Sequence, residues 1–197
     1  MTVALGIIRV AVPSNPASLG DWLIDPARRR VVTFAIHLVP VAGIAFLWFI
    51  GVLRNRLGKL EDQFFATVFL GSGLMFVACL FAAGSISGAF LEQTMSRNGI
   101  PPNMEVYEFG RRLSRAFVNV FAVKMAAVFM FSTCTIALRT AIFPRWIAFL
   151  GFACGLTMLL VIANWGWIAL IFPLWMLIVS MHILFSDLDS PPEKKLC

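Results

Sequence analysis

WIAFLGFACGLTMLLVIANWGWIALIFPLWMLIVSMHILF, residues 146–185, runs for 40 residues without one Asp, Glu, Lys or Arg. A helix needs about 20 apolar residues to cross the roughly 30 Å hydrocarbon core of a bilayer. A single helix over the whole run would extend for about 60 Å at 1.5 Å per residue. The run therefore predicts two membrane helices, about 146–163 and 167–185, separated at the turn-forming NWGW of residues 164–167.

The composition of the whole chain agrees with a membrane location. Its 197 residues are 60% hydrophobic and 13% charged, and the mean hydropathy is +0.88. Soluble domains are about 45–50% apolar and about 25% charged. The net charge of +6 does not indicate a nucleic-acid partner, because the arginines stand at the ends of apolar runs and form no separate basic patch with interleaved aromatics.

Three more apolar runs are long enough to cross a bilayer. They are residues 31–53, 64–91 and 116–138. The sequence thus predicts an all-α, polytopic membrane helix bundle of about five transmembrane helices within residues 31–185. We expect Pro40 and Pro173 to bend their helices.

The segments outside the bundle have their own signals. Residues 1–30 carry Leu19, Trp22 and Leu23 at helical spacing, which predicts an interfacial segment. Asp25-Pro26 is typical of a helix start. In the long connection of about 92–114, Asn103 is placed to cap a helix that leads into the third span. Residues 186–197 form a polar tail.

Arginines next to the apolar runs are expected to meet anionic headgroups. These interfacial basic residues are Arg28, Arg29, Arg30, Arg111, Arg112 and Arg115. Lys and Arg are almost equally divided between the two sides, so the positive-inside rule favours neither orientation. The last two predicted helices form a hairpin whose NWGW tip is uncharged and whose two open ends carry cations. Because cations favour the cytoplasmic side, this hairpin favours a cytoplasmic C terminus.

Two stretches carry a resemblance to a known group of proteins. FLWFIGVLRNRLGKLEDQFFATVFLGSGLMF (residues 46–76) and ALRTAIFPRWIAFLGF (residues 137–152) resemble small, uncharacterised multi-spanning membrane proteins of actinobacteria. The resemblance covers about half of the chain and rests on the hydrophobic pattern with the LRNRLG and FPRW turns. It implies a bacterial plasma membrane and brings no activity with it.

Catalytic and metal-binding patterns are missing from the sequence. No Asp or Glu falls inside a predicted span, whereas proton-coupled carriers use intramembrane carboxylates. No hydrolase, phosphate-binding or zinc motif occurs, and the four cysteines form no CxxC pair. We therefore predict no catalytic residue, no metal site and no cofactor other than bound lipid.

Glycines in the predicted spans favour close helix packing, because a helix without side-chain bulk can approach its neighbour. The helix-packing candidates are Gly71, Gly73, Gly84, Gly88, Gly151 and Gly155. Both a contact within this chain and a contact with another subunit fit this pattern.

Lys124 is the most unusual residue, because it lies within the apolar run NVFAVKMAAVFMF of residues 119–131. A lysine at mid-membrane is unfavourable by about 2.5–3.5 kcal/mol on insertion scales. It can extend its stem towards the interface, carry no charge, or face a polar pocket. His37 and Asn119 are the candidates for lining such a pocket, which would bind an anionic ligand, a lipid phosphate or the acidic residue of a partner.

These observations favour an integral membrane protein that is a structural or accessory subunit of a membrane complex. The partners would be membrane lipids and other membrane subunits. The alternative is a small transporter or a lipid- or ligand-binding membrane protein with a polar pocket near Lys124. An enzyme is the least supported class.

Overall fold

The computed structural model describes residues 26–57, 63–96, 103–140, 144–160 and 168–188. Every regular element in these ranges is helical, which confirms the predicted all-α class. In chain order they are α3 (Pro26–Leu57), α4 (Gln63–Ser96), α5 (Met104–Ala116), the π-helical η3 (Phe117–Ala122), α6 (Val123–Thr140), α7 (Arg145–Leu160), the 3₁₀ turn η4 (Ile168–Leu170) and α8 (Ile171–Leu188). The expected interfacial segment up to residue 25, the NWGW break and residues 189–197 of the tail lie outside the described ranges.

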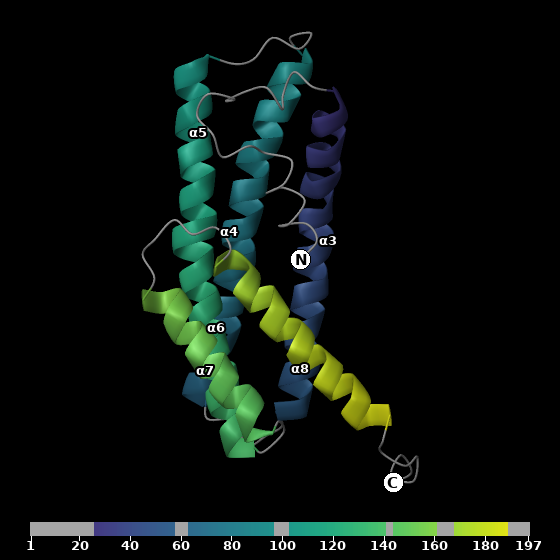
Figure 1. Cartoon of the computed structure of the whole chain (residues 1–197), viewed down its shortest axis with the longest axis vertical. Helices are drawn as coiled ribbons and strands as arrows, with labels where there is room; N and C mark the ends of the chain where they lie inside the picture. Colours follow the sequence, from purple (N-terminus) through teal and green to yellow (C-terminus); the bar gives the residue numbers. More distant parts are fainter. Residues whose placement is uncertain (1–25, 58–62, 97–102, 141–143, 161–167, 189–197) are drawn as a thin grey trace.

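The bundle consists of a tall part and a short part (Figure 1). Helices α3, α4 and the continuous rod α5–η3–α6 stand side by side along the long axis. Helices α7 and α8 lie against one half of this assembly, and α7 packs mainly on α6. One half of the molecule is therefore thicker than the other.

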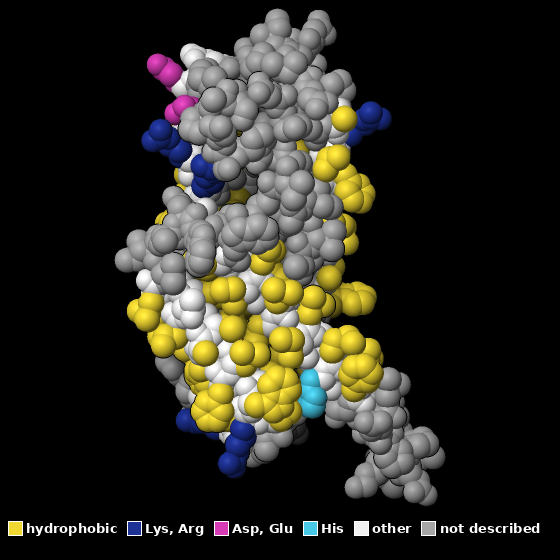
Figure 2. All heavy atoms as spheres, viewed as in Figure 1, with side chains coloured by type: hydrophobic (Ala, Val, Ile, Leu, Met, Phe, Trp, Pro, Cys, Tyr) yellow, Lys and Arg dark blue, Asp and Glu magenta, His cyan; other side chains and the backbone are white. Residues whose placement is uncertain are grey.

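Within the described ranges, three helices are long and apolar enough to cross a membrane. Their apolar segments are Arg30–Asn55, Thr67–Gln93 and Glu105–Thr140. The apolar helices Arg145–Leu160 and Ile171–Phe185 are shorter. On the face shown in Figure 2, the described charged side chains lie towards the two ends of the molecule, and hydrophobic side chains gather on the described surface between them. This pattern is that of a protein embedded in a membrane.

The helix starts follow the predicted local signals. Helix α3 begins at Pro26. Proline has no backbone N–H, and at the first position of a helix this group would have no acceptor within the helix. The Oδ1 atom of Asn103 accepts a hydrogen bond from the backbone N–H of Glu105 at 3.2 Å, which confirms the predicted cap of α5. Pro173 is the third residue of α8 and comes shortly after the 3₁₀ turn η4. The bends expected at Pro40 and Pro173 stay predictions.

The π-helical segment η3 keeps one face of the rod turned towards α4. Before it, Gly110 and Ser114 contact α4; after it, Ala122 lines a cavity together with α4 side chains. Ser114 and Ala122 are eight residues apart, whereas two α-helical turns span about seven. Phe121, at the seven-residue position, is 54% exposed. The π segment thus contributes one extra residue and restores the packing register.

The core of the thick half is a cluster of phenylalanine rings from four helices. Phe46 of α3 lies 5.4 Å from Phe76 of α4, 5.3 Å from Phe129 of α6 and 5.8 Å from Phe172 of α8 between ring centroids. Phe76 and Phe172 meet edge to face at 4.9 Å, an arrangement that stabilises aromatic pairs. The thin half has a smaller cluster of Val32, Leu91 and Tyr107.

Candidate functional site

Lys124 is the second residue of α6, the helix that follows the π segment directly. Its Nζ atom donates a hydrogen bond to the backbone carbonyl of Met158 at 3.1 Å and a second one to the carbonyl of Leu159. Both acceptors belong to α7, which packs against α6. The amino group is therefore held by the backbone of the neighbouring helix.

The position of these carbonyls explains why a lysine is favourable there. The last four carbonyls of any α-helix have no partner within the helix. In α7 these are the carbonyls of residues 157–160, so Lys124 satisfies two of the four. The aligned peptide dipoles also give this end of the helix a partial negative charge, which attracts a cation.

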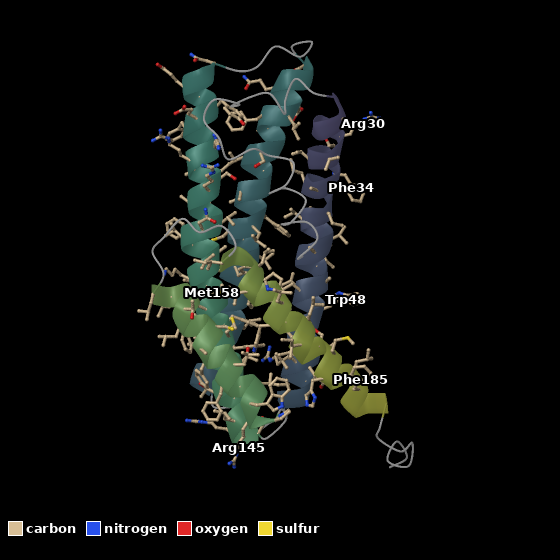
Figure 3. The ribbon with its side chains drawn as sticks, in the orientation of Figure 1. Arg30, Phe34, Trp48, Arg145, Met158 and Phe185 are labelled. Carbon is tan, nitrogen blue, oxygen red and sulfur yellow. The ribbon has the colours of Figure 1, made fainter. Side chains whose placement is uncertain are left out.

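The contact lies well inside the apolar part of the rod. Lys124 follows Arg115 by nine residues and precedes Arg139 by fifteen, which places it about 14 Å and about 22 Å along the axis from these two cations. Helix α7 has 16 residues and so extends for about 24 Å. Figure 3 shows Met158 between Arg30 and Arg145 along the long axis. The end of α7 is therefore far from the charged ends of the bundle, and in a membrane its carbonyls would need a donor from the protein.

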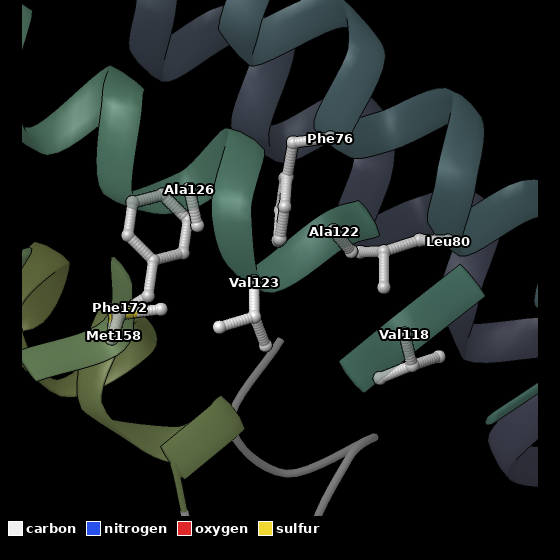
Figure 4. Close-up of a pocket in the computed structure, with 8 residues that line it drawn as sticks. All are labelled: Phe76, Leu80, Val118, Ala122, Val123, Ala126, Met158 and Phe172. Carbon is white, nitrogen blue, oxygen red and sulfur yellow. The ribbon is translucent and has the colours of Figure 1, made fainter. Parts of the chain in front are cut away.

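The interior next to this contact is apolar and closely filled. A cavity of about 10 Å³ lies between α4, η3, α6, α7 and α8 (Figure 4). Its lining residues are Phe76, Leu80, Val118, Ala122, Val123, Ala126, Met158 and Phe172. About 10–15 Å³ is the minimum for one water molecule, which would also need polar partners. This cavity is too small and too apolar for a ligand.

The structure does not bring His37 to Lys124. Ile36, the residue before His37, packs near Gly88 of α4. A Cβ atom added to Gly88 would lie 3.9 Å from the Ile36 side chain. Val123, next to Lys124, shares its cavity with Leu80 of α4. Gly88 and Leu80 are eight residues, about 12 Å, apart on α4. The side chain of His37 is also exposed.

Asn119 lies in the π segment with its side chain half-buried. The backbone of α7, the partner that holds the lysine, was not among the candidates named from the sequence. No sequence signal points to it, because the end of α7 at Leu160 is set by the fold. The bound anion or partner acid proposed from the sequence stays a prediction.

The arginines predicted to be interfacial occupy one end of the bundle. Arg30 is exposed at the start of the apolar segment of α3, and Arg112 and Arg115 are exposed on α5. Arg112 forms an ion pair with Glu108 at 3.3 Å on the surface of α5. Arg111 is half-buried. The side chains of Arg28 and Arg29 lie outside the described set.

The predicted packing glycines have three kinds of surroundings. At Gly73 a Cβ would lie 2.6 Å from Ile50 of α3, and at Gly151 it would lie 2.3 Å from the Sγ atom of Cys134. Gly84, Gly88 and Gly155 would make ordinary contacts of 3.5–3.9 Å within the chain. Gly71 has nothing within 4 Å. Most of these glycines thus serve contacts inside this chain.

Two packing glycines were missed by the sequence analysis. A Cβ on Gly43 would lie 2.6 Å from Phe81, and one on Gly110 would lie 2.2 Å from Phe90. Gly110 did carry a signal, because a glycine within the polar helix of residues 104–116 lowers helix stability by about 1 kcal/mol relative to alanine. Its close contact with Phe90 gives the reason for that residue.

The chemistry of the described residues adds no metal centre. Among residues 26–57, 63–96, 103–140, 144–160 and 168–188, no group of three or more His, Cys, Asp or Glu side chains is placed to hold a metal ion. Cys79 and Cys134 are buried free thiols, and Cys154 is half-buried.

No family model, curated protein or solved structure matches the chain. The identification of this site therefore depends on its own geometry.

Proposed function

We propose that this chain is an integral membrane protein that acts as a structural or accessory subunit of a membrane complex. The observation that carries this proposal is the filled centre of the bundle. Where a carrier would need a polar path, rings of Phe46, Phe76, Phe129 and Phe172 meet at centroid distances of 4.9–5.8 Å. The adjacent cavity of about 10 Å³ has an apolar lining.

The outer surface supports membrane embedding and offers area to partners. Along α3, large apolar side chains face outwards: Phe34 is 63% exposed and Trp48 is 78% exposed. They lie on the outer side of α3 in Figure 3. Such a surface needs lipid or another apolar protein surface around it. We place the chain in a bacterial plasma membrane, as the resemblance to actinobacterial membrane proteins implies, with lipids and other membrane subunits as its partners.

The test is purification at native expression level in a mild detergent, followed by native mass spectrometry. The proposal expects other membrane proteins in fixed stoichiometry with this chain, and their loss when a harsher detergent is used. A detergent-solubilised monomer that carries only lipid or a small molecule, in the mild detergent as well, would contradict it. A tagged, unrelated membrane protein of similar size serves as the control for non-specific capture.

A small transporter or a lipid- or ligand-binding protein is the second candidate, and one observation favours it. Helix α7 ends with backbone carbonyls that accept hydrogen bonds from a lysine within an apolar segment, and interrupted helices of this kind form ion and substrate sites in transporters. The same mass spectra separate the two candidates. A monomer with one reproducible bound mass, lost on replacement of Lys124, would favour this second function over the first.

A further inference from the structure

The end of α7 has the chemistry of a cation site. Two backbone carbonyl oxygens, those of Met158 and Leu159, converge on one nitrogen atom. Backbone carbonyls at the C-terminal ends of helices that stop inside a membrane are known ligands of small monovalent cations. The negative end of the helix dipole adds to the attraction.

We propose that this helix end is a monovalent-cation site and that the Lys124 ammonium fills it as a cation tethered to α6. An ammonium group has three donors and no acceptor, so it is suited to a set of carbonyl oxygens. The tether supplies the cation from within the chain. The site would therefore be open to a free cation only when the lysine side chain is removed.

The placement of carboxylates supports this reading. Residues 116–160 and 168–185 contain no Asp or Glu. The described acidic side chains of α4 and α5 are Glu92, near the end of α4, and Glu105 and Glu108, near the start of α5. Glu108 forms an ion pair with Arg112. Within this part of the chain, the backbone carbonyls of Met158 and Leu159 are the acceptors that stabilise the ammonium group.

The π segment sets the direction of Lys124. Because η3 contributes one extra residue before Lys124, it turns everything after it by about 100° relative to a plain α-helix. This turn places Lys124 towards α7 while Ala122 and Ala126 remain in the interior between α4 and α8. The site thus combines a helix end on α7 with a register change on the neighbouring rod.

The experiment uses the full-length protein in detergent or nanodiscs, with unfolding followed by the fluorescence of its six tryptophans. In Lys124→Ala, three carbons and the amino nitrogen are missing, and n-propylammonium has the same atoms. We expect Lys124→Ala to lower the Tm by about 5–10 °C, because two charge-assisted hydrogen bonds are lost. Millimolar n-propylammonium should restore a large part of this loss.

The controls test whether the rescue is specific. Tetramethylammonium has the charge but no N–H donor, so it should not restore the Tm of Lys124→Ala. In Lys124→Met the space is filled by an uncharged chain, so n-propylammonium should have no effect, as in the wild type. Equal responses of all three proteins to n-propylammonium would overturn the cation site.

A second pair of variants decides the question if Lys124→Ala does not fold. Lys124→Arg keeps a charged donor, so it should retain a Tm close to that of the wild type, whereas Lys124→Met should fall clearly below it. If Lys124 only extended into lipid, removal of an unfavourable charge would leave Lys124→Met as stable as the wild type or more stable. That order of Tm values would overturn the proposal without any ligand.

Discussion

A Cβ atom on Gly151 of α7 would lie 2.8 Å from the indole Nε1 of Trp175 on α8 and 2.3 Å from the Sγ atom of Cys134 on α6. The same indole donates a 3.5 Å hydrogen bond to the backbone carbonyl of Ile147, one turn earlier in α7. Three helices therefore meet at Gly151, and the buried ring of Trp175 lies directly on the helix backbone.

Gly151→Ala should destabilise the protein by about 1–3 kcal/mol, because the new methyl group overlaps two buried side chains. This loss exceeds the gain of about 1 kcal/mol from replacing a helical glycine. Gly71→Ala is the matched control: it lies within α4 with nothing within 4 Å, so it should be neutral or stabilising. Thermal unfolding in detergent measures both, and an equal response at the two positions would contradict the three-helix contact.

Phe129→Ala should be among the most destabilising single changes, by about 3–5 kcal/mol. Phe129 is fully buried and touches Phe69 at 4.7 Å and Phe46 at 5.3 Å between ring centroids. Phe149→Ala removes the same atoms from a side chain that is 63% exposed and should change stability by well under about 1 kcal/mol. Similar losses of Tm in the two variants would show that this ring cluster is not the core.

Ser114→Ala should weaken the attachment of α5 to α4 by about 0.5–1.5 kcal/mol. The Ser114 hydroxyl donates to the carbonyl of Ala83 at 3.2 Å and lies 3.5 Å from the hydroxyl of Ser87. Ser132→Ala is the control, because its hydroxyl bonds to its own helix at Val128. Hydrogen exchange should become faster in α5 for Ser114→Ala alone; unchanged exchange would mean that this bond contributes nothing.

The C terminus is expected on the cytoplasmic side. A protein that fluoresces only in the cytoplasm, fused after Cys197, should therefore be bright in cells, and the same fusion at residue 1 should be dark. The reason is the uncharged NWGW tip opposite the cations at Arg145 and at Lys194 and Lys195. The reverse pattern of fluorescence would invert the topology.

Local features of the fold could be predicted from the sequence, since they depend on neighbouring residues. The separate helices α7 and α8 follow from a charge-free run too long for one span, and the cap by Asn103 follows from residues beside it. The partner of Lys124 could not be predicted. It depends on where α7 ends and on how α6 is rotated, and both are set by contacts between distant segments.

Glycine spacing predicted close packing, but it did not predict which residues lie opposite each glycine. The pair Gly151 and Gly155 indicated close packing, but only one of the two faces side chains at less than 3 Å. Which glycine is essential depends on the size of the residue opposite, here Trp175 or Cys134, and sequence spacing contains no information about that residue. The sequence also could not decide between contacts within the chain and contacts with another subunit.

The π-helical segment Phe117–Ala122 has a consequence for the natural history of this chain. A single added codon in an ordinary α-helix produces such a segment, and the helix keeps its two ends packed by widening locally. A homologue that lacks this residue would align with a one-position gap here and would have a plain α-helix. We expect such a homologue to have no lysine at the position of Lys124, because its side chain would no longer point at the end of α7.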